Sequence, residues 1–108
     1  MTYSLPRPDY AKQQLGRRSS GVQLIAHSKF EAEARQIKLA LPYLEIRVGS
    51  DVHSKVVLIE PWTIWVTSAN FGSSKWHEAA IGTKSEEAHN WYVEHMWLPL
   101  WRGCREVR

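Results

Sequence analysis

Short apolar runs and a helical repeat alternate along the first half of the chain. Residues 22–26 form an apolar run between turn-like residues, which is typical of a buried strand. Apolar side chains then recur at helical intervals over residues 29–40, and Ser28 and Glu31 have the spacing of a capping box at the start of this helix. Residues 44–48 alternate strictly between apolar and polar, which predicts a strand with one covered face. This order of strand, helix and strand favours a right-handed crossover in a partly parallel sheet.

The second half of the chain predicts an antiparallel pair of strands, one further strand and a closing helix. Residues 55–59 and 63–67 are expected to be neighbouring strands of the same sheet, and residues 78–82 are apolar enough to form another strand. Ser85 is placed to cap a last helix, which should end before Pro99. The buried stripe of this helix would comprise Ala88, Trp91, Tyr92, His95 and Met96.

These elements indicate an α/β fold in which a mixed β-sheet is flanked by helices. A length of 108 residues allows a single domain, which we place at residues 21–108. Residues 1–20 would form an N-terminal arm or a short helix from Asp9 to Leu15, with Pro8 in its first turn. The arginines of this arm would either contact nucleic acid or remain solvated; they are Arg7, Arg17 and Arg18.

Charge and cysteine content narrow the classes of partner only slightly. The formal net charge of +3, with 14 Lys and Arg against 11 Asp and Glu, permits a polyanionic partner without requiring one. Cys104 is the single cysteine, so no disulfide forms within the chain and a reducing compartment is favoured. No run approaches the roughly 18 apolar residues of a membrane helix. We therefore expect a soluble cytoplasmic protein that does not contact a membrane.

Four polar side chains are expected to converge where two of the predicted strands meet. His53 and Lys55 are two residues apart at the start of one strand, so both leave the same face. Ser68 and Asn70, again two apart, follow the next strand. An imidazole, an ammonium, a hydroxyl and a carboxamide in one place are chemistry suited to a phosphate.

This pattern resembles the signature of the phospholipase D superfamily. The signature is His-x-Lys, four residues, Asp, and then a small residue followed by Ser-x-Asn, with an acidic residue downstream. The residues that carry the match are His53, Lys55, Glu60, Ser68, Asn70 and Glu78. Glu60 stands where the family usually has Asp, and Thr67 stands where it usually has Gly before the Ser. The resemblance covers residues 20–100 and implies one half of a phospholipase D-like fold.

The resemblance also implies a homodimer, because the small nucleases of this superfamily carry one copy of the signature and build one active site from two chains. Chemistry supports this independently, since one histidine is poorly suited to act as nucleophile and as general acid in the same step. His53 would form a phosphohistidine while His53 of the partner subunit protonates the leaving oxygen. Lys55 and Asn70 would hold the non-bridging oxygens, so the reaction would need neither a metal nor another cofactor.

The remaining signature residues take supporting roles in this expectation. By resemblance, Glu78 would accept a hydrogen bond from the far nitrogen of His53 and fix its tautomer. Ser68 would order the loop or the phosphate, and Glu60 would support the fold. Trp76 and His77, just before Glu78, would either stack on a base or pack in the core or in a dimer interface.

The predicted function is that of a metal-independent phosphodiesterase, a DNA or RNA endonuclease. The alternative is a non-catalytic nucleic-acid-binding or assembly protein with a degenerate site, which Glu60 and the short chain favour. Phospholipid hydrolysis is a third hypothesis, although it would require a larger apolar mouth than this length is expected to build. A histidine at the start of a strand is also commonly structural, and the presence of Lys55, Asn70 and Glu78 is what makes a phosphodiester site the preferred interpretation for His53.

Overall fold

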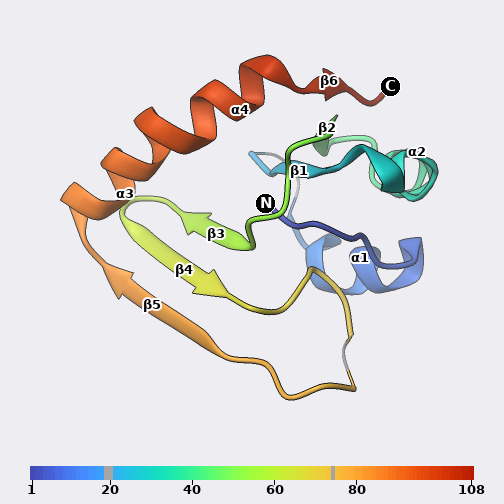
Figure 1. The fold of residues 1–108 in the computed structure, drawn as a ribbon. Helices are drawn as coiled ribbons and strands as arrows, with labels where there is room; N and C mark the ends of the chain where they lie inside the picture. The colour runs from blue at the N-terminus through green and yellow to red at the C-terminus, as the bar shows by residue number, and fades with distance from the viewer. Residues whose placement is uncertain (19–20, 74) are drawn as a thin grey trace.

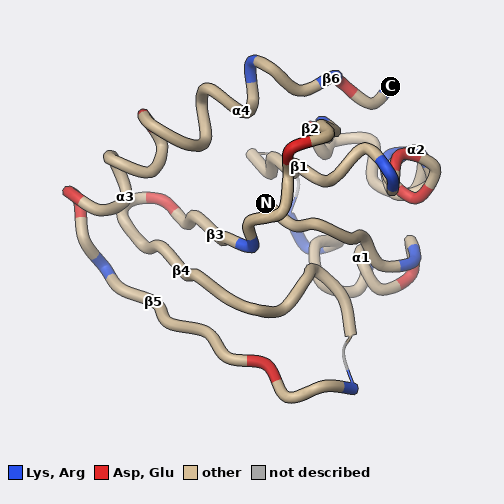
Figure 2. Tube along the Cα trace, viewed as in Figure 1, with Lys and Arg blue, Asp and Glu red and all other residues tan. Residues whose placement is uncertain are grey.

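The chain forms an α/β domain in which helices flank two small three-stranded sheets (Figure 1). The computed structural model describes residues 1–18, 21–73 and 75–108. Basic and acidic residues are interspersed along this trace (Figure 2). In the described part of the chain, no helix is long and apolar enough to cross a membrane.

The first sheet contains the predicted strand–helix–strand unit. Strands β1 (Gln23–His27) and β2 (Glu45–Gly49) are parallel, and the short 3-10 helix η1 (Ser28–Phe30) and helix α2 (Glu31–Ala40) connect them. Apolar side chains from both strands and from α2 are fully buried together; they include Ala26, Ala34, Ile37, Leu44 and Ile46. Complete burial of a side chain such as isoleucine contributes about 1.5–3 kcal/mol, so this face is the main stabilising contact of the sheet.

A two-residue strand that the sequence pattern did not predict completes the first sheet. Strand β6 (Arg105–Glu106) pairs with β2 in the antiparallel direction, which makes the sheet mixed. The guanidinium of Arg105 donates two hydrogen bonds to the carboxylate of Glu31, at 2.6 and 2.5 Å. Bonds from Arg105 and Arg35 lower the pKa of Glu31 to about 2. The carboxylate of Glu31 therefore binds Arg105 of β6 and does not complete the predicted capping box with Ser28. The side chain of His27 caps η1 instead.

The second sheet consists of strands β3 (Val56–Ile59), β4 (Thr63–Thr67) and β5 (Ala80–Lys84), all antiparallel in that order. The prediction that these strands continue the first sheet was wrong. Residues 1–4, which we call the N-terminal segment, lie between β1 and β3 and take the place of direct pairing (Figure 1). The amide of Thr2 donates to Ile25 at 3.0 Å, while the amide of Val56 donates to the carbonyl of Met1 at 3.1 Å.

Helix α1 (Pro8–Leu15) follows the N-terminal segment, with Pro8 in its first turn as expected. Ala11 of this helix is fully buried in the cluster that contains α2. The side chains of the three arginines in this part of the chain are exposed; they are Arg7, Arg17 and Arg18.

The closing helix is longer than predicted. The side chain of Ser85 caps α3 (Glu86–Tyr92) by accepting a hydrogen bond from the amide of Ala88 at 3.1 Å, which confirms the expected start. The helix continues through a π-helical turn, η2 (Val93–Trp97), into α4 (Leu98–Gly103). The predicted end before Pro99 was wrong, because Pro99 lies in the first turn of α4, where a missing N–H is tolerated.

The buried side of this helix also differs from the predicted stripe. His89 and Trp97 are the buried residues of α3 and η2, whereas Trp91 and His95 are exposed. The rings of Trp91 and His95 stack on each other at a centroid distance of 4.8 Å. Ala88, Tyr92 and Met96 of the predicted stripe are half-buried. The π-helical turn widens the helix after Tyr92, so a stripe extrapolated at a period of 3.6 residues loses its register there and misplaces His95.

Candidate functional site

The antiparallel pairing of β3 with β4 brings four of the predicted residues to one end of a hairpin. Val56 is opposite Val66, and the amide of Thr67 donates to the carbonyl of Lys55 at 3.0 Å. His53 and Lys55 therefore precede β3 at the same end at which Ser68 and Asn70 follow β4. The sequence pattern predicted this convergence.

His53 lies exposed in the loop between β2 and β3. Its ring packs against the ring of Tyr3 at a centroid distance of 5.1 Å and an interplanar angle of 50°. The ammonium of Lys55 donates to the carbonyl of His53 at 3.1 Å, which holds the positive charge at the backbone of the loop that carries the imidazole. The loop thus carries an exposed imidazole and, two residues later, a half-buried lysine.

Asn70 connects the end of β4 to the N-terminal segment. Its side-chain oxygen accepts hydrogen bonds from the amides of Tyr3 and Ser4, each at 3.1 Å. Two amide donors require the oxygen at this position, so the NH₂ group of Asn70 points elsewhere as a donor. Tyr3, fixed by Asn70 through its backbone and packed on His53 through its ring, links these two predicted site residues.

Ser68 and Glu78 form a second pair across the connection from β4 to β5. The hydroxyl of Ser68 donates to the carboxylate of Glu78 and accepts a bond from the amide of Ala79 at 3.0 Å. The carboxylate is therefore oriented by Ser68. The expected hydrogen bond between Glu78 and His53 stays a prediction.

Glu60 lies at the opposite end of β3 from His53 and Lys55. Its side chain is 84% exposed, and its carboxylate oxygen is 3.9 Å from Nε2 of His89 in α3. His89 is buried, and this nitrogen has no hydrogen-bond partner in the part of the chain that the structure describes. Glu60 thus lies where the hairpin contacts α3, away from the end of the hairpin that carries His53 and Lys55.

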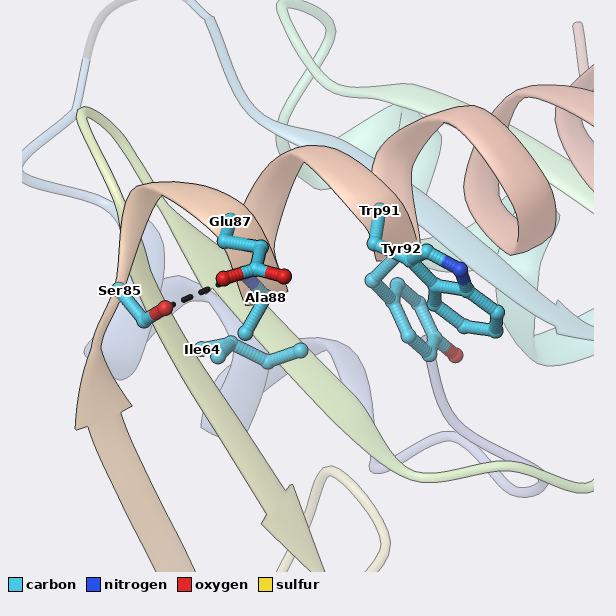
Figure 3. Close-up of a pocket in the computed structure, with 6 residues that line it drawn as sticks. All are labelled: Ile64, Ser85, Glu87, Ala88, Trp91 and Tyr92. Atoms are coloured by element: carbon cyan, nitrogen blue, oxygen red, sulfur yellow. Dashed lines mark hydrogen bonds between the residues drawn. The ribbon is translucent and has the colours of Figure 1, made fainter.

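Two open clefts of about 430 Å³ each lie outside the His53 cluster. The first lies between β4 and α3, where Ile64, Ala88, Trp91 and Tyr92 give it an apolar lining (Figure 3). The second lies between the loop at residues 49–54 and the closing helix. His53, Lys55 and Asn70 line neither of these two clefts; His53 is exposed, whereas Lys55 and Asn70 are half-buried.

One titratable group in the lining of each cleft has a shifted pKa, namely Tyr92 in the first and Cys104 in the second. Burial raises the pKa of Tyr92, although a hydrogen bond with Ser54 acts in the opposite direction. Burial also raises the pKa of the Cys104 thiol, with a smaller opposing effect from Arg47. Both groups are thereby kept neutral, and a neutral thiol is a weak nucleophile.

Comparison with known proteins does not assign the chain to a family. No family model, no curated protein and no solved structure matches it.

Within residues 1–18, 21–73 and 75–108, no group of three His, Cys, Asp or Glu side chains is placed to hold a metal ion.

Sequence reasoning missed two residues, namely Tyr3, which contacts His53, and His27, which contacts Tyr3. The rings of Tyr3 and His27 lie 4.9 Å apart, with Tyr3 in contact with both histidines. His27 carried one usable signal, because it directly follows a predicted strand parallel to the strand that precedes His53, and such strands end at the same edge of a sheet. Tyr3 carried no such signal, since nothing in the sequence around it predicts that this segment lies between two sheets.

Proposed function

We propose that the protein is a metal-independent phosphodiesterase that cleaves DNA or RNA through a phosphohistidine at His53. The observation that carries the proposal is the hairpin end, where His53 and Asn70 both contact Tyr3 and Lys55 donates to the carbonyl of His53. These side chains offer a nucleophile, a cation and an amide donor on an open surface, which a polymer reaches more easily than a closed pocket. The mild positive charge of +3 is compatible with a polyanionic substrate.

The reaction proceeds in two balanced steps. A ring nitrogen of His53 attacks phosphorus, the bond from phosphorus to the leaving oxygen breaks, and that oxygen takes a proton from His53 of the partner subunit. Water then attacks the phosphohistidine, gives its proton to the same partner imidazole and releases His53. Lys55 and the NH₂ group of Asn70 stabilise the charge on the non-bridging oxygens during both steps.

Chelator-resistant cleavage tests this proposal directly. Purified protein incubated with plasmid and single-stranded DNA in excess EDTA is expected to cleave, and a denaturing gel in alkali should reveal a protein–DNA adduct that acid removes, as a phosphoramidate requires. If the protein shifts nucleic acid on a gel and leaves every strand intact, the non-catalytic nucleic-acid-binding alternative replaces the proposal.

A second copy of the chain is the proposed partner in the site, and the surface area of the protomer supports it. The accessible surface is 7271 Å². A folded monomer of 12.5 kDa is expected to expose about 6,200 Å². The excess of roughly 1,000 Å² matches the area of about 800 Å² or more that one protomer buries in a stable dimer.

The outer face of the second sheet is the surface we assign to this contact. Val57, Ile59 and Trp65 are 48%, 44% and 42% exposed, and the pairing of Val57 with Trp65 places these side chains on the same face. The ring of Trp65 lies over Gly82, where an added Cβ would come within 2.3 Å of it. Because Lys55 and Val57 are two residues apart, this apolar face leads directly to the cluster around His53.

Trp65→Lys is therefore expected to convert the protein to a monomer and to abolish cleavage while retaining the circular dichroism of the fold. A buried lysine at a two-fold contact would bring two like charges together, which is strongly unfavourable. Analytical ultracentrifugation measures the change. Ile81→Lys is the matched control, because Ile81 is 80% exposed on the opposite face of the sheet and its substitution should leave the dimer intact. Wild-type protein that sediments as a monomer at high concentration would contradict the shared site.

A further inference from the structure

A second histidine of the same protomer, His27, contacts the same tyrosine ring as His53. His27 ends β1 and is opposite Gly49 at the end of β2, and the loop after β2 carries His53. The two parallel strands thus deliver both histidines to the same edge of the first sheet. The ring of Tyr3 contacts both, at centroid distances of 4.9 Å to His27 and 5.1 Å to His53.

The backbone orients the imidazole of His27. The amide of Lys29 donates to Nδ1 of His27 at 3.0 Å. Because Nδ1 accepts this hydrogen bond, Nε2 is the ring nitrogen left as an N–H donor. His27 therefore presents a hydrogen-bond donor and an aromatic face.

Tyr3 is held in place before any ligand arrives. The amide of His27 donates to the carbonyl of Tyr3 at 3.3 Å, and Asn70 accepts from the amide of Tyr3 on the other side. Phe30 packs edge-on against the Tyr3 ring at 5.5 Å and 78°. Tyr3 and His27 nevertheless remain partly exposed. Rings ordered in advance lose little conformational entropy when a ligand stacks on them.

The charges around these rings favour an anionic ligand. Lys29 follows His27 and is exposed, and the ammonium of Lys55 lies at the loop that holds His53. The nearby carboxylate of Glu31 is paired with Arg105 and Arg35, which neutralises it. Aromatic rings beside two lysines are the combination with which proteins bind single-stranded nucleic acid.

We infer that Tyr3 and His27 form a subsite for the unpaired nucleotide next to the cleaved phosphate, so that the substrate is single-stranded nucleic acid. The planes of the two rings are tilted by 57°, so the base stacks on one ring and meets the edge of the other, and Nε2–H of His27 donates to an acceptor on the same nucleotide. In a duplex the base faces are covered by neighbouring pairs and do not reach these rings. The assignment of the cleaved phosphate rests on the proposed function, whereas the stacking of an unpaired base does not.

Fluorescence anisotropy in a His53→Gln background tests the subsite without cleavage. The probes are a labelled oligothymidylate of about 12 nucleotides and a labelled duplex of the same length. Tyr3→Leu and His27→Gln are each expected to raise Kd for the single strand about tenfold, the usual effect of losing one stacking platform. Kd for the duplex should not change.

Two conservative variants serve as controls. Tyr3→Phe keeps the ring and should bind like the parent, while His95→Gln removes an exposed histidine from the closing helix and should also have no effect. Melting curves show whether Tyr3→Leu is folded. If it is unfolded, the Kd values of His27→Gln for single strand and duplex decide the test alone.

The outcomes separate the subsite from the catalytic proposal. Equal losses for single strand and duplex, or no loss for either, would overturn the subsite whether or not the wild-type protein cleaves DNA. If the variants lose affinity for the single strand alone and the wild-type protein cleaves no nucleic acid, the subsite is upheld and the phosphodiesterase proposal is rejected.

Discussion

Replacing His53 with alanine is expected to lower the rate of DNA cleavage by about 10³-fold or more, the scale of loss seen when a covalent nucleophile is removed. In a shared site the substitution removes the nucleophile from one protomer and the general acid from the other. The melting temperature should remain that of the wild-type protein, because the imidazole is exposed and its described contact is the ring of Tyr3.

Mixing His53→Ala protein with wild-type protein tests whether two protomers share one active site. When tagged His53→Ala protein is denatured and refolded together with wild-type protein, a mixed dimer holds a single His53 and should be inactive. Activity would then fall as the square of the wild-type fraction, measured as initial nicking rate against composition. His95→Ala protein, mixed in the same way, should leave the rate proportional to total protein. A linear decline with His53→Ala would show that each protomer works alone.

Asn70→Asp is expected to separate a structural role from a catalytic one at the same position. The aspartate keeps an oxygen that accepts from the amides of Tyr3 and Ser4, so the fold should be retained. It loses the NH₂ donor and adds a negative charge next to the phosphate, and we expect kcat/KM for cleavage to fall about 10²- to 10³-fold. Steady-state cleavage of a single-stranded oligonucleotide and thermal melting measure the two effects side by side.

Asn70→Ala provides the comparison. Both amides lose their acceptor, and leaving a buried donor unsatisfied costs about 1–3 kcal/mol. Alanine should therefore lower both stability and activity, whereas aspartate lowers activity alone. If aspartate melted as early as alanine, the oxygen of Asn70 would not be what holds the N-terminal segment.

The parts of the fold that depend on local patterns were predictable from the sequence. Strand β4 was predicted within its observed bounds, Thr63–Thr67, because apolar residues and flanking turn signals define it without reference to the rest of the chain. The crossover from β1 through α2 to β2 was likewise predicted by periodicity. Convergence of His53 with Asn70 followed from the hairpin between β3 and β4, in which sequence neighbours are also neighbours in space.

The parts that depend on distant contacts were not predictable. Residues 1–4 carry no strand pattern, yet they pair with Ile25 and Val56 and divide one expected sheet into two. Strand β6 is two residues long and owes its place to β2 and to the ion pair of Arg105 with Glu31. The subsite formed by Tyr3 and His27 depends on the same insertion, so periodicity alone could not reveal it.

The position of the N-terminal segment has a consequence for the order of folding. The β3–β4 hairpin and the β1–α2–β2 crossover are built from contacts close in sequence and are able to form early. The segment joins them through hydrogen bonds that span 55 residues from Met1 to Val56 and 66 from Ser4 to Asn70. Such contacts form only after long loops have closed. We therefore expect Tyr3 to meet His27 and His53 late in folding, when the first residues of the chain enter between the two sheets.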